Sequence, residues 1–189
     1  MNTIYTRYIK YSLDKVFAVL ILILFWWLYL LCAVAIIVCD GWPIIYRQVR
    51  IGERGRRFMI YKFRSMIQNA DKVGPLHTEV GDARVTPLGN FLRKTSLDEI
   101  PQVFNVLLGD MSFVGYRPDV PKPGDDYSQS KYLLRPGITG LAQVNGRSNM
   151  TVEQQLYYES EYPKRVSFFM DIWILCRTAL VVLHCEDSV

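Results

Sequence analysis

The chain has 189 residues with a formal net charge of +4, and half of its residues are hydrophobic, which suits one domain with an appendage. The charge is uneven, because residues 1–64 carry ten Lys/Arg against three Asp/Glu and residues 65–189 carry twelve against fifteen. A cationic region beside an apolar segment is typical of a protein that contacts anionic lipid, whereas nucleic-acid binding spreads Lys and Arg over a domain face. The four cysteines form no C-x-x-C pair and the two histidines are isolated, so a structural zinc site is not expected.

An uncharged segment of 24 residues, from Val16 to Cys39, contains neither proline nor glycine. At about 1.5 Å per residue, a straight helix of this length crosses a bilayer core of roughly 30 Å. Both flanks of the segment are cationic, whereas a spanning helix usually has one cationic end. Two cytoplasmic ends would imply a helix that enters the membrane and turns back, and a spanning helix is the alternative.

The middle of this segment, Phe25-Trp26-Trp27-Leu28, contains no helix breaker. Tryptophan prefers the membrane interface, so the pair predicts a shallow turning point, and packing inside the bilayer is the simpler alternative. The residues assigned to the membrane run from Val16 through Trp26 and Trp27 to Cys39.

Two apolar-polar segments follow the membrane segment. Residues 44–51 and 58–66 predict strands joined by a turn, and together a β-hairpin. Residues 67–90 are polar and rich in Gly and Pro, so they predict mostly loop.

Helical spacing returns in residues 90–108, where Pro101 divides the pattern into two short helices, the second starting near Asp98-Glu99. Residues 109–148 predict loops. Residues 151–162 predict a polar helix, and residues 166–184 predict an amphipathic helix that either packs in the core or lies on a membrane surface.

Asp98 and Glu99 form a pair of adjacent carboxylates in the middle of this region. Two adjacent acids repel each other and must both be hydrated or paired. Acids in the first turn of a helix complement its dipole, which is one explanation of the pair. Metal-assisted phosphoryl chemistry near a membrane is the other.

Four motifs then occur in order along the chain. They are YKFRSM at residues 61–66, SLDEIPQVFNVL at residues 96–107, GDMSFVGYRP at residues 109–118 and RPGITGLAQVNGR at residues 135–147. In these motifs the chain closely resembles the bacterial monotopic polyprenyl-phosphate phosphoglycosyl transferases, which are the initiating sugar transferases of exopolysaccharide, O-antigen and glycoprotein pathways. The resemblance covers nearly the whole chain.

The resemblance implies an α-rich α/β monotopic membrane protein. Its N-terminal re-entrant membrane helix would be followed by a small β-hairpin, short amphipathic surface helices and a loop-rich catalytic part. It implies transfer of sugar-1-phosphate from a UDP-sugar to undecaprenyl phosphate with release of UMP. The sugar stays open, because the motifs do not separate glucose, galactose and N-acetylated amino sugars.

The resemblance also implies roles for the carboxylate pair. Asp98 would attack the β-phosphorus of the donor and form a covalent phosphosugar intermediate. Mg²⁺ would bind hard oxygen ligands at Asp98, with Glu99 as a further candidate ligand. Glu99 would hold the metal, orient Asp98 or accept a proton, and these alternatives stay open.

Phosphate recognition requires fixed guanidinium or ammonium donors. A solvated cationic face is the more frequent role for any single Lys or Arg. The expected phosphate-binding residues are Lys62, Arg64, Arg117 and Arg147 within the matched motifs, and Arg93 five residues before Asp98.

The chain departs from the family pattern at two places. Trp26-Trp27 stands where the family usually has a Ser-Pro break in its membrane helix, which puts the re-entrant geometry in question. Gly115-Tyr116-Arg117-Pro118 stands where a Gly-Pro-Arg-Pro turn is common, so the rigidity of this loop is expected to differ. Because little sequence follows the last amphipathic helix, we expect a minimal catalytic form.

These observations predict a membrane-anchoring unit in residues 1–40 and a catalytic domain in residues 41–189. The expected location is the bacterial cytoplasmic membrane, with the catalytic part facing the cytoplasm. The expected partners are the UDP-sugar donor, undecaprenyl phosphate and membrane lipids, without nucleic acid, and the resemblance leaves room for downstream glycosyltransferases and for oligomers. The alternative function is a catalytically silent membrane adaptor of a polysaccharide assembly complex.

Overall fold

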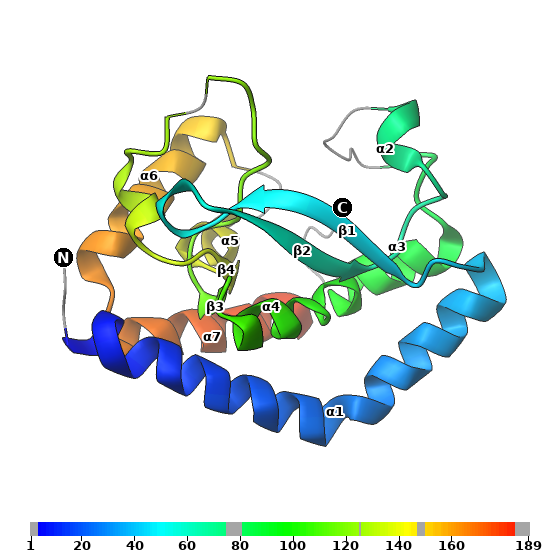
Figure 1. Cartoon of the computed structure of the whole chain (residues 1–189), viewed down its shortest axis with the longest axis horizontal. Coiled ribbons are helices and arrows are strands. Elements are labelled where there is room, and N and C mark those ends of the chain that lie inside the picture. The colour runs from blue at the N-terminus through cyan, green and yellow to red at the C-terminus, as the bar shows by residue number, and fades with distance from the viewer. Residues whose placement is uncertain (1–3, 75–80, 125, 147–149, 184–189) are drawn as a thin grey trace.

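The computed structural model describes residues 4–74, 81–124, 126–146 and 150–183 (Figure 1). The helices are the π-helical turn Tyr5–Ile9, α1 (Lys10–Asp40), η2 (Glu53–Gly55), α2 (Ala70–Val73), α3 (Pro87–Lys94), η3 (Leu97–Glu99), α4 (Gln102–Leu108), η4 (Ser130–Leu133), α5 (Leu141–Gly146), α6 (Val152–Arg165) and α7 (Phe168–Leu183). The strands are β1 (Ile45–Ile51), β2 (Arg57–Phe63), β3 (Ser112–Val114) and β4 (Gly137–Thr139). The predicted helix-rich fold with a small hairpin is confirmed.

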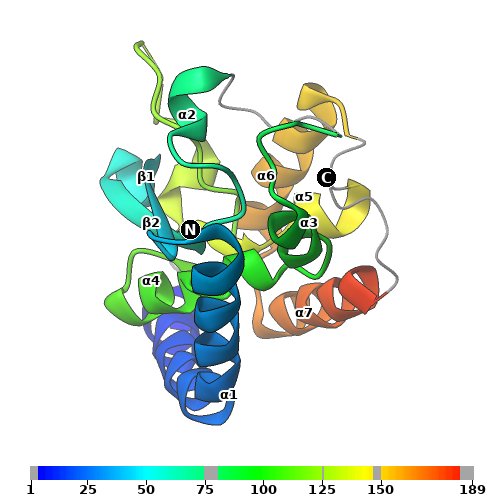
Figure 2. The ribbon, with the colours of Figure 1, turned by 90° about the vertical axis from the view of Figure 1, so that its right-hand side faces the viewer.

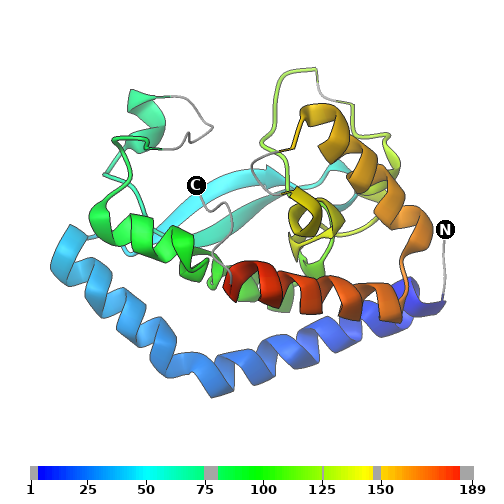
Figure 3. The same cartoon turned by 180° about the vertical axis from the view of Figure 1, so that it is seen from behind.

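The elements stack in layers above α1. Helices α3, α4 and α7 run above α1, and the β1–β2 hairpin lies above them together with α5 and α6 (Figures 1 and 3). Figure 2 shows that α4 and α7 occupy opposite edges of the middle layer. The hairpin is therefore separated from α1 along much of its length by short amphipathic helices.

Helix α1 is bent at its middle, although no proline or glycine occurs there (Figure 1). Phe25 leaves the helical region, with φ −114° and ψ 16°. The indole Nε1–H of Trp27 donates a hydrogen bond of 3.1 Å to the carbonyl of Leu24, which an unbroken helix would bond to the backbone N–H of residue 28. A side chain that enters the backbone ladder is a recognised cause of a helix bend. Trp27 thus satisfies the carbonyl that the bend releases.

The outer face of α1 is apolar and exposed. Val16, Trp26 and Trp27 are each more than half exposed, and Cys39 is exposed as well. By length and composition, the described helical stretch Tyr5–Asp40 could cross a membrane. Exposure of this much apolar surface calls for a non-aqueous environment.

The inner face of α1 belongs to the protein core. Ala18 packs against Ile60 and Val106, and Ile36 packs in a second cluster with Phe63. Ala18 and Ile36 are completely buried. The bent helix is thus part of the cores on which the hairpin and α4 rest.

Buried polar contacts hold both ends of α1. Near its start, Lys10 forms an ion pair of 2.5 Å with Asp171 of α7, which also accepts hydrogen bonds of 2.6 Å from Tyr5 and Tyr162. At its end, the guanidinium of Arg64 donates to the carbonyls of Asp40 and Gly41 at 2.5 and 2.8 Å. Because a helix leaves its last carbonyls without intrahelical partners, Arg64 satisfies groups that the end of α1 exposes.

The hairpin is fixed to α4 by one buried amide. β1 and β2 pair antiparallel, with Ile45 opposite Phe63 and Ile51 opposite Arg57. The side chain of Asn105 accepts a hydrogen bond of 3.0 Å from the backbone of Tyr61 and donates one of 2.7 Å to the carbonyl of Met59. This amide completes the edge of β2, so α4 is held against the strand that carries Lys62.

The predicted loop region 109–148 contains more regular structure than expected. β3 and β4 form a short parallel pair in which Ser112 lies opposite Gly137 and Val114 opposite Thr139, and α5 follows directly. Strands of only three residues, one of them with glycine, have no readable periodicity, which is why the sequence did not predict them. Helix α6 also runs past Pro163 to Arg165, starting from a capping box of Thr151 and Gln154.

Candidate active site

The carboxylate pair lies on a tight turn between two helices. Ser96 adopts the left-handed conformation with φ 56°, and Leu97–Glu99 then form the single 3₁₀ turn η3. The two acids thus lie in the first turn of a helical segment, as expected, but this turn is 3₁₀ and α4 begins only at Gln102. Pro101 precedes that first residue, and proline is well accommodated where a helix begins. The dipole of α4 is therefore not a sufficient explanation of the two acids.

Asp98 is a buried carboxylate. Its residue is only 7% exposed, and in the part of the chain that the structure describes its side chain has no hydrogen bond or ion pair. Burial raises the pKa of Asp98 to about 6, with the charge of Glu99 acting in the same direction and those of Lys62 and Arg93 opposing it. Asp98 is therefore an anion at neutral pH that little in the protein solvates, as a nucleophile requires.

Glu99 has the opposite electrostatic character. Its Oε1 forms an ion pair of 2.6 Å with Nζ of Lys62, and Gln102 also donates to its side chain. Burial acts to raise the pKa of Glu99, but the charges of Lys62 and Arg117 outweigh burial and lower it. Two neighbouring carboxylates with pKa values displaced in opposite directions are typical of an active site.

Arg93 and Arg64 lie close to this turn but are engaged in protein contacts. Nε of Arg93 donates a hydrogen bond of 2.9 Å to Oγ of Ser65, and the charge of Asp98 acts on Arg93. Arg64 is 5% exposed and caps α1, yet its Nε and its second terminal nitrogen have no partner among the described residues. Phosphate binding by Arg64 and Arg93 stays a prediction.

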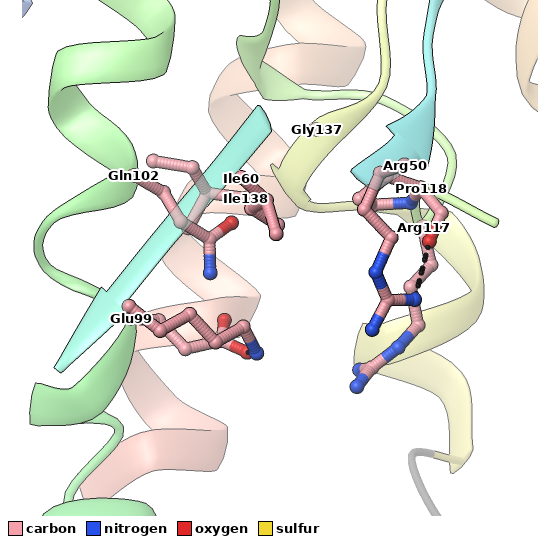
Figure 4. A pocket seen from close by; sticks show the side chains of 9 residues that line it. Arg50, Ile60, Glu99, Gln102, Arg117, Pro118, Gly137 and Ile138 are labelled. Atoms are coloured by element: carbon pink, nitrogen blue, oxygen red, sulfur yellow. Dashed lines mark hydrogen bonds and ion pairs between the residues drawn. The ribbon is translucent and has the colours of Figure 1, made fainter. Parts of the chain in front are cut away.

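An open hollow lies beside the turn, between two polar walls (Figure 4). Glu99 and Gln102 extend from one side, and Arg50 and Arg117 extend from the other. Lys62 also lines the hollow. The predicted residues Lys62, Glu99 and Arg117 are thus brought together from three distant motifs.

Sequence reasoning missed Arg50 and Gln102 as residues of this hollow. Arg50 belongs to the cationic flank that follows the apolar segment, and Gln102 lies inside the SLDEIPQVFNVL motif without a role assigned to it. The sequence signal that would place Arg50 in a site is weak. Arg47 and Arg50 lie in the same strand, and nothing in the sequence distinguishes them. Arg147 lies outside the described residues.

The loop that carries Arg117 is held rigidly without the proline that the family pattern favours. A Cβ on Gly115 would lie 2.4 Å from the carbonyl of Arg135, so only glycine fits this close approach. The next residue, Tyr116, is 2% exposed and packs edge-on against Tyr132, with ring centroids 5.3 Å apart. Aromatic packing thus takes the place of a rigid ring in the backbone.

Ion pairs fix the far end of the same loop. Asp119 accepts from Lys131 at 2.8 Å and from the hydroxyl of Tyr132 at 2.9 Å. The ammonium of Lys131 also pairs with Glu159 of α6 at 2.8 Å. Lys131 therefore connects the Arg117 loop to a buried carboxylate of another helix.

A second, apolar hollow lies on the membrane-helix side of the turn. It is open to solvent and is lined by Tyr29, Ala33, Trp42, Pro43, Ile44, Ile45, Arg47 and Phe63. The hydroxyl of Tyr29 donates a hydrogen bond of 2.9 Å to the carbonyl of Ile100. This hollow is called the apolar groove below. One of its lining residues is therefore hydrogen-bonded to the residue that follows Glu99.

Comparison with known proteins identifies the family of the chain. The model of the family described as "Bacterial sugar transferase" matches residues 5–185. The chain is 40% identical to the undecaprenyl-phosphate galactose phosphotransferase of Salmonella typhimurium, over 97% of this chain and 42% of that protein. It is 41% identical to the UDP-glucose:undecaprenyl-phosphate glucose-1-phosphate transferase of Escherichia coli, over 91% of this chain and 39% of that protein.

The chain thus spans about two fifths of the length of these two relatives. It is also 37% identical to the uncharacterized sugar transferase EpsL of Bacillus subtilis, over 84% of each chain. The family model covers nearly all of the sequence, including helix α1 and the carboxylate pair. The chain therefore belongs to the bacterial sugar transferase family.

Proposed function

We propose that the protein transfers sugar-1-phosphate from a UDP-sugar to undecaprenyl phosphate and releases UMP, as the first membrane step of glycoconjugate synthesis. The observation that carries this proposal is the buried Asp98, whose pKa is raised to about 6 beside the cationic Lys62. The names of two relatives specify undecaprenyl phosphate as acceptor and galactose or glucose as the transferred sugar. Which sugar this chain transfers is a matter for a donor panel.

The proposed first step is nucleophilic displacement at phosphorus. A carboxylate oxygen of Asp98 forms a bond to the β-phosphorus of the donor, and the bond from that phosphorus to the bridging oxygen breaks. The electron pair of the broken bond stays on the oxygen of UMP, which leaves. The sugar-1-phosphate remains on Asp98 as an acyl-phosphate ester. Lys62 holds Glu99 by an ion pair next to the reacting group, which supports a positioning role for Glu99.

In the second step, a phosphate oxygen of the acceptor attacks the same phosphorus and the carboxylate of Asp98 departs. This regenerates the enzyme and forms the diphosphate linkage of the product. We propose that the isoprenoid chain of the acceptor enters along the apolar groove. The support is the apolar lining of the groove and the hydrogen bond from Tyr29 to Ile100, one residue beyond Glu99.

We also propose that Mg²⁺ binds at this site together with the substrate. Among the described residues, no group of three or more His, Cys, Asp or Glu side chains could hold a metal ion alone. Mg²⁺ is commonly bound by one or two carboxylates plus substrate phosphates, which fits Asp98 and Glu99. When bound, the ion neutralises charge on the diphosphate. Oxygen ligands from the protein would come from these two side chains.

A release assay with the full chain in lipid nanodiscs tests the function. The protein is incubated with Mg²⁺, undecaprenyl phosphate and each member of a panel of UDP-sugars, and UMP is measured. We expect UMP formation with at least one donor. No release across the panel would instead support the silent membrane adaptor. Such an adaptor would have no need of the carboxylate pair that the chain retains.

The rate of the first step is expected to depend on pH through Asp98. Only the ionised carboxylate attacks, so below about pH 6 the rate should fall tenfold per pH unit. The measurement is the UMP burst from one donor without acceptor, because the acceptor phosphate itself titrates near pH 6. A profile that stays flat down to pH 4.5 would exclude a raised pKa at the nucleophile.

We propose that α1 is re-entrant and that the protein is monotopic. Residues 1–40 would anchor it in the bacterial cytoplasmic membrane, and residues 41–189 would form a catalytic domain facing the cytoplasm. The support is the bend at Phe25, the apolar outer face and the cationic flanks. The amphipathic helices α4 and α7 run along the same side as α1, as helices lying on a membrane surface would.

The bend is expected to depend on the indole N–H of Trp27. Trp27→Phe keeps an aromatic ring but leaves the Leu24 carbonyl without its partner, so we expect a loss of about 0.5–1.5 kcal/mol of stability. Trp26→Phe is the matched control, because no hydrogen bond from Trp26 bears on the bend, and it should melt like the parent. The measurement is the melting temperature of both variants in nanodiscs.

Labelling of single cysteines in a background without native cysteines tests the topology itself. Cysteines replacing Tyr8 and Arg56, which flank α1 and are exposed, should react only from the cytoplasmic side. Labelling from opposite sides would mean that the helix spans the membrane.

For the bend, equal melting temperatures of Trp27→Phe and Trp26→Phe would show that the indole N–H of Trp27 does not stabilise it.

A further inference from the structure

The hollow beside the carboxylates has a second arginine that faces it. Arg50 extends from β1 and Arg117 extends from the loop after β3, and the two guanidiniums lie next to each other on the wall opposite Glu99 and Gln102 (Figure 4). The two segments are also joined through their backbones, since the N–H of Ile51 donates to the carbonyl of Asp119 at 2.9 Å. The arginines are thus held together by the fold.

This arrangement is electrostatically unfavourable without an anion. Burial lowers the pKa of Arg50, and the positive charge of Arg117 lowers it further. In the described ranges, no carboxylate lies within ion-pair distance of either guanidinium. Two adjacent guanidiniums that face an open hollow match the geometry of a phosphate group.

Arg50 is prepared for such a ligand by its own contacts. One terminal nitrogen donates to the carbonyl of Pro118 at 3.0 Å, and the other donates to Oε1 of Gln48 at 2.6 Å. Its Nε is buried and has no partner among the described residues. A buried donor without a partner is costly, which is a physical reason to expect a ligand there.

We propose that Arg50, together with Arg117, binds the phosphate that leaves as UMP. The proposal rests on the proposed function and deepens it. In phosphoryl transfer the attacking and leaving oxygens lie roughly in line with phosphorus. Glu99 lines one side of the hollow, and Asp98 precedes it in η3. With attack from the side of η3, the leaving oxygen would lie toward the opposite wall. The electron pair of the broken phosphorus–oxygen bond collects on this oxygen, where the two guanidiniums stabilise it.

The test compares Arg50→Ala and Arg50→Lys with the parent, using the full chain in nanodiscs. Binding of UMP is measured by calorimetry with Mg²⁺ and without sugar donor. We expect Arg50→Ala to weaken UMP binding by about 10- to 100-fold and Arg50→Lys to have a smaller effect, because lysine keeps the charge but not the planar fork. Arg57→Ala is the matched control, since Arg57 is an exposed arginine on the neighbouring strand, and it should bind UMP as the parent does.

The two half-reactions give a second readout that a merely structural role would not separate. In Arg50→Ala, formation of the phosphosugar adduct from donor should slow. Transfer from the isolated adduct to undecaprenyl phosphate, after removal of UMP, should proceed at the parental rate.

Parental UMP affinity in both Arg50 variants, equal slowing of both half-reactions, or no UMP binding by the parent would each overturn the proposal. If Arg50→Ala does not fold, the same comparisons are made with Arg50→Lys. If UMP binding depends on Arg50 but the protein forms no phosphosugar adduct, the proposed role of the arginine pair is supported. In that case only the proposed aspartyl intermediate is contradicted.

Discussion

Asp98→Asn is expected to abolish formation of the phosphosugar adduct and, at the same time, to make the protein more stable. Asparagine has nearly the same shape but lacks the negative charge that the nucleophile requires. Intact mass after incubation with donor and no acceptor should show the added sugar phosphate on the parent, and peptide mapping should find it on Asp98. The variant should show none.

The stabilisation follows from the displaced pKa. The unfolded carboxyl titrates near 3.8 and the folded one near 6, so ionisation favours unfolding. The free-energy cost of ionising Asp98 in the folded protein is absent below about pH 4 and complete above about pH 6. The difference between the two pKa values corresponds to a cost of roughly 3 kcal/mol. Asp98→Asn should therefore melt several degrees higher than the parent at pH 7.5, and the difference should vanish near pH 4.

The control for both readouts is Asp126→Asn, which changes an exposed aspartate. It should form the adduct, and it should not melt higher than the parent, because hydrogen bonds from Ser128 lower the pKa of Asp126 rather than raise it. An adduct mapped to another residue would refute the role given to Asp98, whatever the melting temperatures. A lower melting temperature of Asp98→Asn would show that the carboxylate is paired in the folded protein.

Lys131→Met is expected to cause the largest loss of stability, about 3–5 kcal/mol. Lys131 is 5% exposed and pairs with Asp119 and Glu159, and the side chain of Glu159 is only 1% exposed. Without the ammonium, Glu159 stays buried as an unpaired charge and Asp119 loses a contact that holds the Arg117 loop. The measurement is chemical unfolding in nanodiscs or detergent.

Lys164→Met provides the matched control. Lys164 pairs with Glu161 on the same helix as Glu159, but its side chain is 59% exposed, so we expect a loss below about 1 kcal/mol. Adding Glu159→Gln to Lys131→Met should recover part of the lost stability by removing the unpaired charge. Equal losses for Lys131→Met and Lys164→Met would mean that the buried ion pairs add no more stability than an exposed pair.

The candidate site was predictable where a motif carried its chemistry. Lys62, Glu99 and Arg117 come from separate motifs and meet at one hollow, as their chemistry led us to expect. Arg50 and Gln102 were not predicted, because single-sequence reasoning cannot tell a half-buried strand arginine from an exposed one. Arg50 differs from its neighbours only through its contacts with Pro118 and Gln48.

The sequence by itself determined the elements whose signal is local. The apolar run before Cys39 and the alternation on either side of Gly52 are properties of neighbouring residues, and they specify the long helix and the hairpin. Family membership was likewise readable from four ordered motifs.

Only the tertiary structure decided features that depend on contacts between distant residues. The bend of α1 is accompanied by a hydrogen bond from the Trp27 indole to the Leu24 carbonyl and by packing of both limbs against the core. The pairing of β3 with β4 brings the Arg117 loop beside Gly137, and β1 brings Arg50 to the same place. These arrangements are stabilised by long-range hydrogen bonds and burial, which no periodicity along the chain records.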